Sequence, residues 1–172
     1  MSIRMTLLNA LSRWFIKPRI KKFAGQSDIE ALRKLFNFLD RTLTANPSLP
    51  CEAVDAGGVP ALWVGHSAGF KRTILYIHGG AFVINMPRTY RLLAETLSKE
   101  LSAQVLLLDY SLAPEFPAPR AADECLNAYR WLIENQGIDP ANIIIGGDSA
   151  GGNLALVSLL DIKRIGLAQP SC

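Results

Sequence analysis

The chain has 172 residues, a length that fits one ordinary domain or part of a larger one. Hydrophobic residues make up 49% and charged residues 19%, which excludes a disordered or fibrous chain and predicts a globular protein with a substantial core. The net charge of +3 is too small to indicate a nucleic-acid partner by itself.

Two helices are predicted before any strand. Apolar side chains recur at helical spacing between Leu7 and Phe15, with basic residues around them. Residues 27–30 fit the start of a second helix, whose apolar face continues to Leu39. We expect residues 1–45 to form a helical cap segment, and we favour packing of the basic first helix on the protein over contact with a membrane.

Residues 46–172 predict an α/β domain. Two short extended runs around Gly57 and Gly58 indicate a hairpin. Beyond it, continuous apolar runs typical of buried strands alternate with stretches of helical periodicity. This alternation predicts a mostly parallel sheet with helices on both faces. The strands are expected at residues 73–77, 105–108 and 143–145, and the helices at residues 90–101, 122–133 and 153–160.

Each predicted parallel strand is followed by a glycine-rich or polar stretch. These are residues 78–82 (His-Gly-Gly-Ala-Phe), 109–115 (Asp-Tyr-Ser-Leu-Ala-Pro-Glu) and 147–152 (Gly-Asp-Ser-Ala-Gly-Gly). Ligands of such sheets bind beyond the carboxyl ends of the strands. We therefore expect the three stretches to meet at one edge of the sheet and to form the functional site.

Residues 147–152 fit a Gly-x-Ser-x-Gly nucleophile elbow, because a strand precedes them and a helix follows. The elbow would expose the Ser149 hydroxyl as the catalytic nucleophile, and the Ala150 amide would contribute to an oxyanion hole. A nucleotide-binding loop is disfavoured, since Asn153 and Leu154 stand where a P-loop needs Lys and Ser or Thr, and no dinucleotide fingerprint fits the glycines.

The stretch at residues 78–82 fits an oxyanion loop. Preorganised N–H groups stabilise the negative charge of a tetrahedral intermediate, and glycines let the backbone approach the substrate. We assign Gly79 and Gly80 as donors, together with Ala150. We expect His78 to hold the loop by hydrogen bonds rather than to act as the catalytic base.

The three motifs, in this order and within residues 46–165, resemble the hormone-sensitive-lipase family of α/β-hydrolases. Residue 81 is alanine where this family often has a third glycine. The resemblance implies a serine carboxylesterase for short to medium acyl esters, whose N-terminal helices belong to a cap over the acyl pocket. It further implies that Asp148 and Glu115 shape the site without attacking the substrate.

The chain departs from the family in its acid and base. The triad order of α/β-hydrolases is Ser, then Asp or Glu, then His. Both histidines, His66 and His78, precede Ser149, and the only acid after the elbow helix begins is Asp161, within that helix. We do not expect His66 to be the base, because it lies in the hairpin region, which the family places away from the serine.

Residues 46–172 therefore predict the N-terminal portion of an α/β-hydrolase domain, ending before the strands that would hold the acid and base. One hypothesis is an esterase completed by a further segment or by a partner. The other is a truncated, non-catalytic relative that at most binds acyl ligands. The strand at residues 143–145 would then be an exposed apolar edge, which predicts poor solubility of the chain alone.

Cofactor, location and partners are less constrained. Three cysteines without close spacing predict free thiols, and two histidines make a metal site improbable, so we expect no metal and no cofactor. No apolar run approaches membrane length and no signal peptide is evident, which favours the cytoplasm. A small-molecule ester is the expected partner, and the oligomeric state is left open.

Overall fold

The computed structural model describes residues 29–65 and 69–171. The chain divides into two units, Met1–Leu35 and Phe36–Cys172, and the fold of the second unit is described here. The helix predicted between Leu7 and Phe15 and the residue His66 lie outside the described residues. The second predicted helix is confirmed as α3 (Ile29–Leu43), and the assignment of residues 1–45 to a cap stays a prediction.

The second unit contains one five-stranded sheet in the order β1-β2-β4-β3-β5. The predicted hairpin is confirmed as the antiparallel pair β1 (Cys51–Asp55) and β2 (Pro60–Val64). β2 pairs antiparallel with β4 (Ala103–Leu108), and β3 (Arg72–Ile77) pairs parallel with both β4 and β5 (Ile143–Gly147). The three strands that precede the motifs, β3, β4 and β5, are thus parallel to one another.

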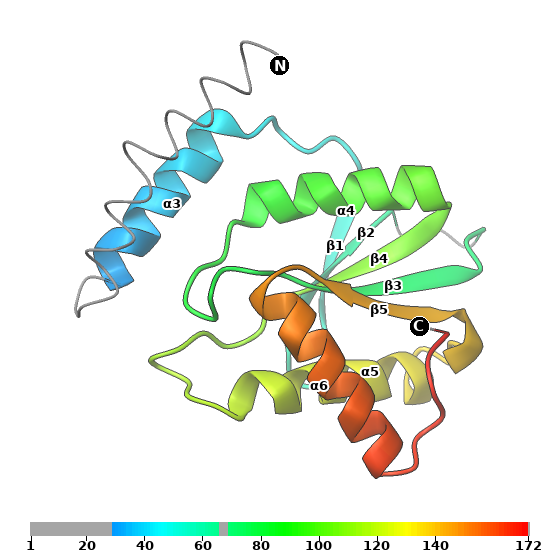
Figure 1. Cartoon of the computed structure of the whole chain (residues 1–172). Coiled ribbons are helices and arrows are strands. Elements are labelled where there is room, and N and C mark those ends of the chain that lie inside the picture. Colours follow the sequence, from blue (N-terminus) through cyan, green and yellow to red (C-terminus); the bar gives the residue numbers. More distant parts are fainter. Residues whose placement is uncertain (1–28, 66–68, 172) are drawn as a thin grey trace, which may run out of the picture. The chain divides into compact units, whose positions relative to one another are not determined.

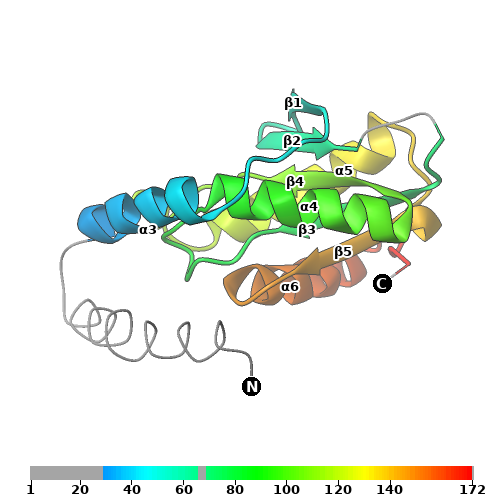
Figure 2. The ribbon, with the colours of Figure 1, turned by 90° about the horizontal axis from the view of Figure 1, so that it is seen from above.

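Helices cover both faces of the sheet, as predicted. Figure 1 shows α4 (Pro87–Leu101) above it, and α5 (Arg120–Glu134) and α6 (Ala150–Arg164) below it. The view in Figure 2 shows α4 running along the sheet in front of β3 and β4. A short 3₁₀ helix, η2 (Pro140–Asn142), leads into β5.

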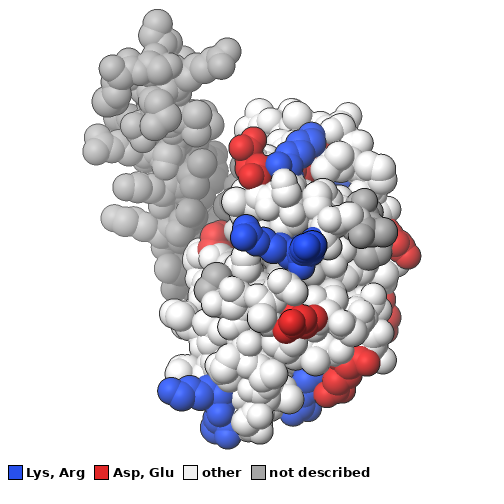
Figure 3. Space-filling model, turned by 90° about the vertical axis from the view of Figure 1, so that its right-hand side faces the viewer, with Lys and Arg blue, Asp and Glu red and all other residues white. Residues whose placement is uncertain are grey.

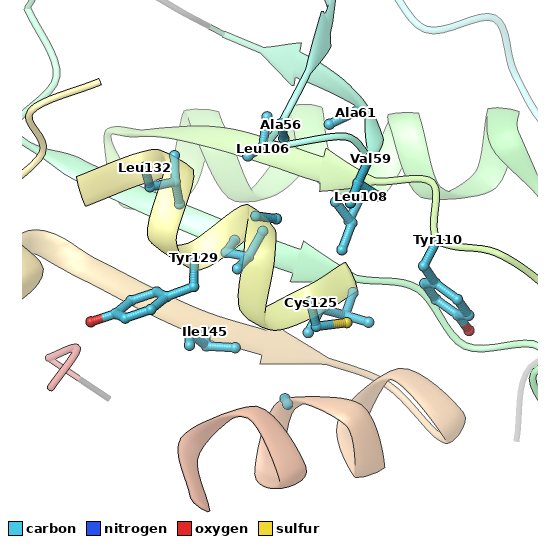
Figure 4. Packing of buried hydrophobic residues seen from close by; sticks show 14 of the residues in the cluster. Ala56, Val59, Ala61, Leu106, Leu108, Tyr110, Cys125, Tyr129, Leu132 and Ile145 are labelled. Carbon is cyan, nitrogen blue, oxygen red and sulfur yellow. The ribbon is translucent and has the colours of Figure 1, made fainter. Parts of the chain in front are cut away.

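Two hydrophobic clusters fill these layers, because alternate residues of each strand point to opposite faces. Ile74 and Tyr76 of β3 belong to the cluster beneath α4, whereas Leu75 and Ile77 belong to the cluster against α5 and α6. Figure 4 shows the second cluster, in which side chains of β4, α5 and β5 meet. Strands buried on both faces explain the continuous apolar runs of the sequence.

Within the described residues, β5 and β1 are the edge strands of the sheet. The Ser171 N–H donates to the Ile143 carbonyl oxygen at 2.8 Å, so the chain after α6 returns to the start of β5. The edge position of the apolar strand β5 agrees with the sequence analysis. The poor solubility expected from it stays a prediction.

The N-terminus of α4 is capped by a residue of α3. Asp40, which is 4% exposed, accepts hydrogen bonds from the N–H groups of Arg88 and Thr89, both at 2.9 Å, and from the Thr89 hydroxyl at 2.6 Å. Met86, at the N-cap position of α4, makes no side-chain capping bond. Asp40 therefore satisfies N–H groups that the first turn of α4 leaves without intrahelical acceptors.

We expect Asp40→Ala to lower the free energy of unfolding by about 1–2 kcal/mol, because three partly buried donors lose their acceptor. Urea denaturation measures this value. Glu100→Ala, at an exposed acidic position of α4 itself, is the matched control and should change stability by less than about 0.5 kcal/mol. Equal effects of the two substitutions would contradict the capping role.

Candidate active site

Ser149 lies at a sharp turn between β5 and α6. Its backbone has φ 50° and ψ −117°, a conformation that non-glycine residues rarely adopt. The residue is exposed, and its side chain makes no capping hydrogen bond to α6. This geometry fits a nucleophile elbow, in which a strained turn presents the serine hydroxyl at the carboxyl end of a sheet.

The glycines on either side of Ser149 are required by the end of β3. A Cβ atom on Gly147 would lie 2.5 Å from the Ile77 carbonyl oxygen. A Cβ atom on Gly151 would overlap the same oxygen and lie 2.6 Å from the His78 carbonyl oxygen. Because real Cβ atoms do not approach backbone this closely, only glycine lets the elbow pack against the loop that follows β3.

His78 is buried beneath the loop that follows β3. It is 1% exposed, its Nδ1 lies 2.7 Å from the Gly79 carbonyl oxygen, and its ring stacks on Tyr110 with centroids 4.3 Å apart. Burial lowers the pKa of His78, so the imidazole is neutral near pH 7. These contacts fit the expected role in holding the loop.

The Gly79 N–H is already engaged. It donates to Oδ1 of Asp148 at 3.0 Å, and Asp148 also accepts hydrogen bonds from the hydroxyls of Tyr76 and Tyr90. Gly79 is therefore not free to bind a substrate oxygen, which corrects its assignment from the sequence as an oxyanion donor. The carboxylate beside the serine takes this N–H, a pairing that no local spacing in the sequence indicates.

Other N–H groups near Ser149 remain available. The Gly80 carbonyl oxygen accepts bonds from Val83 and Ile84, which closes a tight turn in which Gly80, Ala81 and Phe82 all have positive φ. Within the described part of the chain, the N–H groups of Gly80, Ala81 and Ala150 make no hydrogen bond. Ala81, at the position of the family's third glycine, adopts φ 54° at the cost of local strain.

The second motif supports the first. The Tyr110 hydroxyl donates to the His78 carbonyl oxygen at 2.9 Å, and Asn85 donates to Asp109 at 2.7 Å. Residues 109–115 thus brace the loop that follows β3 from the neighbouring strand. Glu115 lies exposed in this stretch, and its expected role in shaping the site stays a prediction.

Glu124 of α5 is a structural residue that the sequence analysis misses. It is 3% exposed and accepts hydrogen bonds from the Ser111 N–H at 2.6 Å, the Ser111 hydroxyl at 2.7 Å and Nε of Arg120 at 2.6 Å. It therefore anchors the second motif to α5. The available signal was a carboxylate beside Cys125 on the apolar face of a predicted helix, with Arg120 four residues before it.

No acid–base pair for Ser149 is present among the described residues. His78 is buried and bonded to its own loop. Asp161 pairs with Arg164 in α6, with 3.0 Å between Oδ1 and the guanidinium nitrogen. The described residues thus supply an exposed serine and free N–H groups without a general base.

An apolar pocket of about 400 Å³ begins one helical turn after Ser149. Asn153, whose N–H donates to the Ser149 carbonyl oxygen at 3.1 Å, is one of its polar lining residues, and Ser111 is another. The first two motifs, the segment that follows the second motif, α5 and α6 contribute its apolar wall residues, among them Phe82, Ala113, Phe116, Ala122, Leu154 and Val157. The pocket can accommodate an apolar chain close to the serine.

Comparison with known proteins identifies the family. A family model described as alpha/beta hydrolase fold matches residues 74–172, more than half of the chain. The chain belongs to the α/β-hydrolase family. The resemblance to the hormone-sensitive-lipase group is confirmed as well, since the human hormone-sensitive lipase is 40% identical over 103 residues, which cover 58% of this chain and 10% of the lipase.

Bacterial relatives match a larger share of this α/β-hydrolase chain. An esterase from Acinetobacter venetianus is 38% identical over 141 residues, covering 82% of this chain and 46% of the esterase. A crystal structure of an esterase from the bacterial hormone-sensitive lipase family superimposes with a TM-score of 0.76 at 34% identity, covering 85% of this chain and 49% of that one. The chain therefore spans about half the length of these relatives.

The charged surface and the lengths of the helices bear on other partners. On the face shown in Figure 3, basic and acidic side chains lie in separate small groups among uncharged residues, rather than in a continuous basic band. No helix in residues 29–65 and 69–171 is long and apolar enough to cross a membrane. In the same described ranges, no three His, Cys, Asp or Glu side chains are grouped to hold a metal ion.

The packing of the elbow predicts that Gly151 of α6 stabilises the protein more than alanine would, which reverses the usual order of the two residues in a helix. Ala is favoured over Gly within a helix by about 1 kcal/mol, yet we expect Gly151→Ala to destabilise the protein by about 1–3 kcal/mol through overlap with the loop after β3. Urea denaturation tests this. The control is Gly146→Ala, where the added methyl group meets no atom within 4 Å. Greater stability of Gly151→Ala would contradict the close packing.

Proposed function

We propose that this α/β-hydrolase chain contributes the nucleophile and the oxyanion-binding groups of a serine carboxylesterase. The observation that supports this most directly is the strained, exposed Ser149 beside N–H groups without acceptors. In an acyl transfer, the serine oxygen attacks the ester carbonyl carbon, and the carbonyl oxygen becomes negatively charged.

The oxyanion donors proposed here are the N–H groups of Gly80, Ala81 and Ala150. Ala81 replaces Gly79, whose N–H is bonded to Asp148. A preorganised donor of this kind lowers a barrier by about 2.7–4 kcal/mol. Asp148 and His78 act as supports of the loop and do not touch the reacting atoms.

The acyl chain of the ester occupies the apolar pocket that begins beside Asn153. Its wall of alanines and larger apolar side chains suits an alkyl chain, and Ser111 and Asn153 are polar groups at its lining. The pocket volume fits the short to medium esters implied by the family resemblance. Small-molecule esters are therefore the proposed substrates.

The base and acid come from a polypeptide segment other than residues 1–172, either continuous with this chain or separate. The relatives are about twice as long as the matched region, and the triad acid and base of α/β-hydrolases follow the serine in the chain. The alternative, a non-catalytic acyl-binding protein, is favoured only by the lack of a base among the described residues.

Turnover of p-nitrophenyl butyrate by the native protein, purified from its source with any segment or partner it retains, tests the proposed function. We expect turnover, and a loss on the order of 10³-fold or more in Ser149→Ala. Ser158→Ala, which changes a buried serine of α6, is the control and should retain turnover. Acyl-ligand binding without turnover would support the non-catalytic alternative and contradict the esterase.

The pocket predicts a change of chain-length preference. We expect Val157→Trp to fill the pocket and to remove the gain from longer acyl chains, which is about fourfold in kcat/KM for each buried methylene. Acetate, butyrate and hexanoate p-nitrophenyl esters measure the profile. Leu156→Trp, at an exposed neighbouring position outside the pocket, is the matched control. An unchanged profile in Val157→Trp would place the acyl chain elsewhere.

A further inference from the structure

Three segments that are distant in sequence meet at the Asp148 carboxylate: the end of β3 with the loop after it, α4, and the elbow itself. Its Oδ1 accepts the Gly79 N–H at 3.0 Å and the Tyr76 hydroxyl at 3.1 Å. Its Oδ2 accepts the Tyr90 hydroxyl at 3.1 Å. Both oxygens are therefore held by donors from β3, α4 and the loop after β3, which fixes the orientation of the carboxylate.

The two tyrosine donors are themselves held by packing. Tyr76 is 9% exposed and Tyr90 is 5% exposed, and their ring centroids lie 6.2 Å apart in the cluster beneath α4. The Tyr90 ring also lies 5.3 Å from the His78 ring. Since a tyrosine has only two side-chain torsions, such packing leaves each hydroxyl in one place.

The tyrosines remain donors over a wide pH range. Burial, followed by the nearby Asp148 charge, raises the pKa of Tyr90 to about 12 and also raises the pKa of Tyr76. Both pKa values are higher in the folded state than the ordinary tyrosine value of 10. The contribution of the two protonated hydroxyls to the free energy of unfolding is therefore fully present below pH 10 and is lost as the pH rises through the folded-state pKa values.

The position of the carboxylate also explains the glycine at position 79. A Cβ atom on Gly79 would overlap Oδ2 of Asp148 and would lie 2.9 Å from the Asp148 carbonyl oxygen. From the sequence, this glycine is expected to allow close approach of the substrate. The structure instead assigns its space to the Asp148 side chain.

We propose that Tyr76 and Tyr90 are positioning residues, whose hydroxyls hold the Asp148 carboxylate on the Gly79 N–H and thereby set the shape of the oxyanion loop. The proposal rests on the proposed function for its catalytic consequence, but the hydrogen-bond arrangement can be tested without turnover. Holding Gly79 in this way leaves the next N–H groups, those of Gly80 and Ala81, for the substrate oxygen.

Hydrogen exchange at the Gly79 amide of the native protein tests the proposal. Tyr76→Phe, Tyr90→Phe and the double variant keep the packed rings and remove only hydroxyls. We expect exchange at Gly79 to accelerate about tenfold in the double variant, because Asp148 loses two of its three donors. Exchange at Leu75, within β3, should stay unchanged, which separates a local effect from general destabilisation.

Tyr129→Phe is the matched control. The Tyr129 hydroxyl donates a hydrogen bond to the Ala168 carbonyl oxygen at 2.6 Å, on the other side of the sheet. Removal of this hydroxyl should therefore leave exchange at the Gly79 amide unchanged. The single variants each keep one hydroxyl on Asp148 and should show smaller accelerations. Unchanged Gly79 exchange in a folded double variant, or equal acceleration at Leu75, would overturn the proposal.

Ester turnover adds a second readout. If the loop binds only the charged intermediate, the double variant should have a lower kcat than the wild type. Its KM for p-nitrophenyl butyrate should stay within about twofold of the wild-type value. Accelerated Gly79 exchange in a protein whose wild type lacks turnover would support the positioning role and contradict only the esterase. A larger change in KM than in kcat would overturn the catalytic part of the proposal.

Discussion

The hydrogen bond between the Gly79 N–H and the Asp148 carboxylate joins two loops that are 69 residues apart in sequence. Close packing of Gly147 and Gly151 against the end of β3 brings these loops together. The elbow and the loop after β3 are therefore one rigid arrangement, in which the place of Ser149 fixes the place of the N–H groups around it. Preorganisation of this kind is what stabilisation of a tetrahedral intermediate requires.

Much of this arrangement follows from the sequence, because strong local patterns determine it. The apolar runs of β3, β4 and β5 predict buried parallel strands, and parallel strands bring the three motifs to one edge. The positions of Ser149 and His78 follow from that topology. Turn glycines, buried strands and helix periodicity act over a few residues, so the sequence alone expresses them.

Contacts across the fold could not be predicted in the same way. The N–H of Gly79 is assigned from the sequence to the substrate, yet a carboxylate from the other loop accepts it. Glu124 and Asp40 appear in the sequence as ordinary helix carboxylates, although both are buried. Asp40 accepts three hydrogen bonds from another segment, and Glu124 accepts two from another segment and one from its own helix. Such pairings depend on tertiary packing, which no local spacing encodes.

The central claim is that Ser149 is a nucleophile supported by oxyanion donors of this chain. Labelling of the native protein with a fluorophosphonate, followed by mass spectrometry of its peptides, tests this claim most directly, because the reagent forms a covalent adduct with an activated serine. The account predicts one adduct, on the peptide that contains Ser149. Ester turnover by a protein labelled at another residue, with Ser149 unmodified, would contradict it.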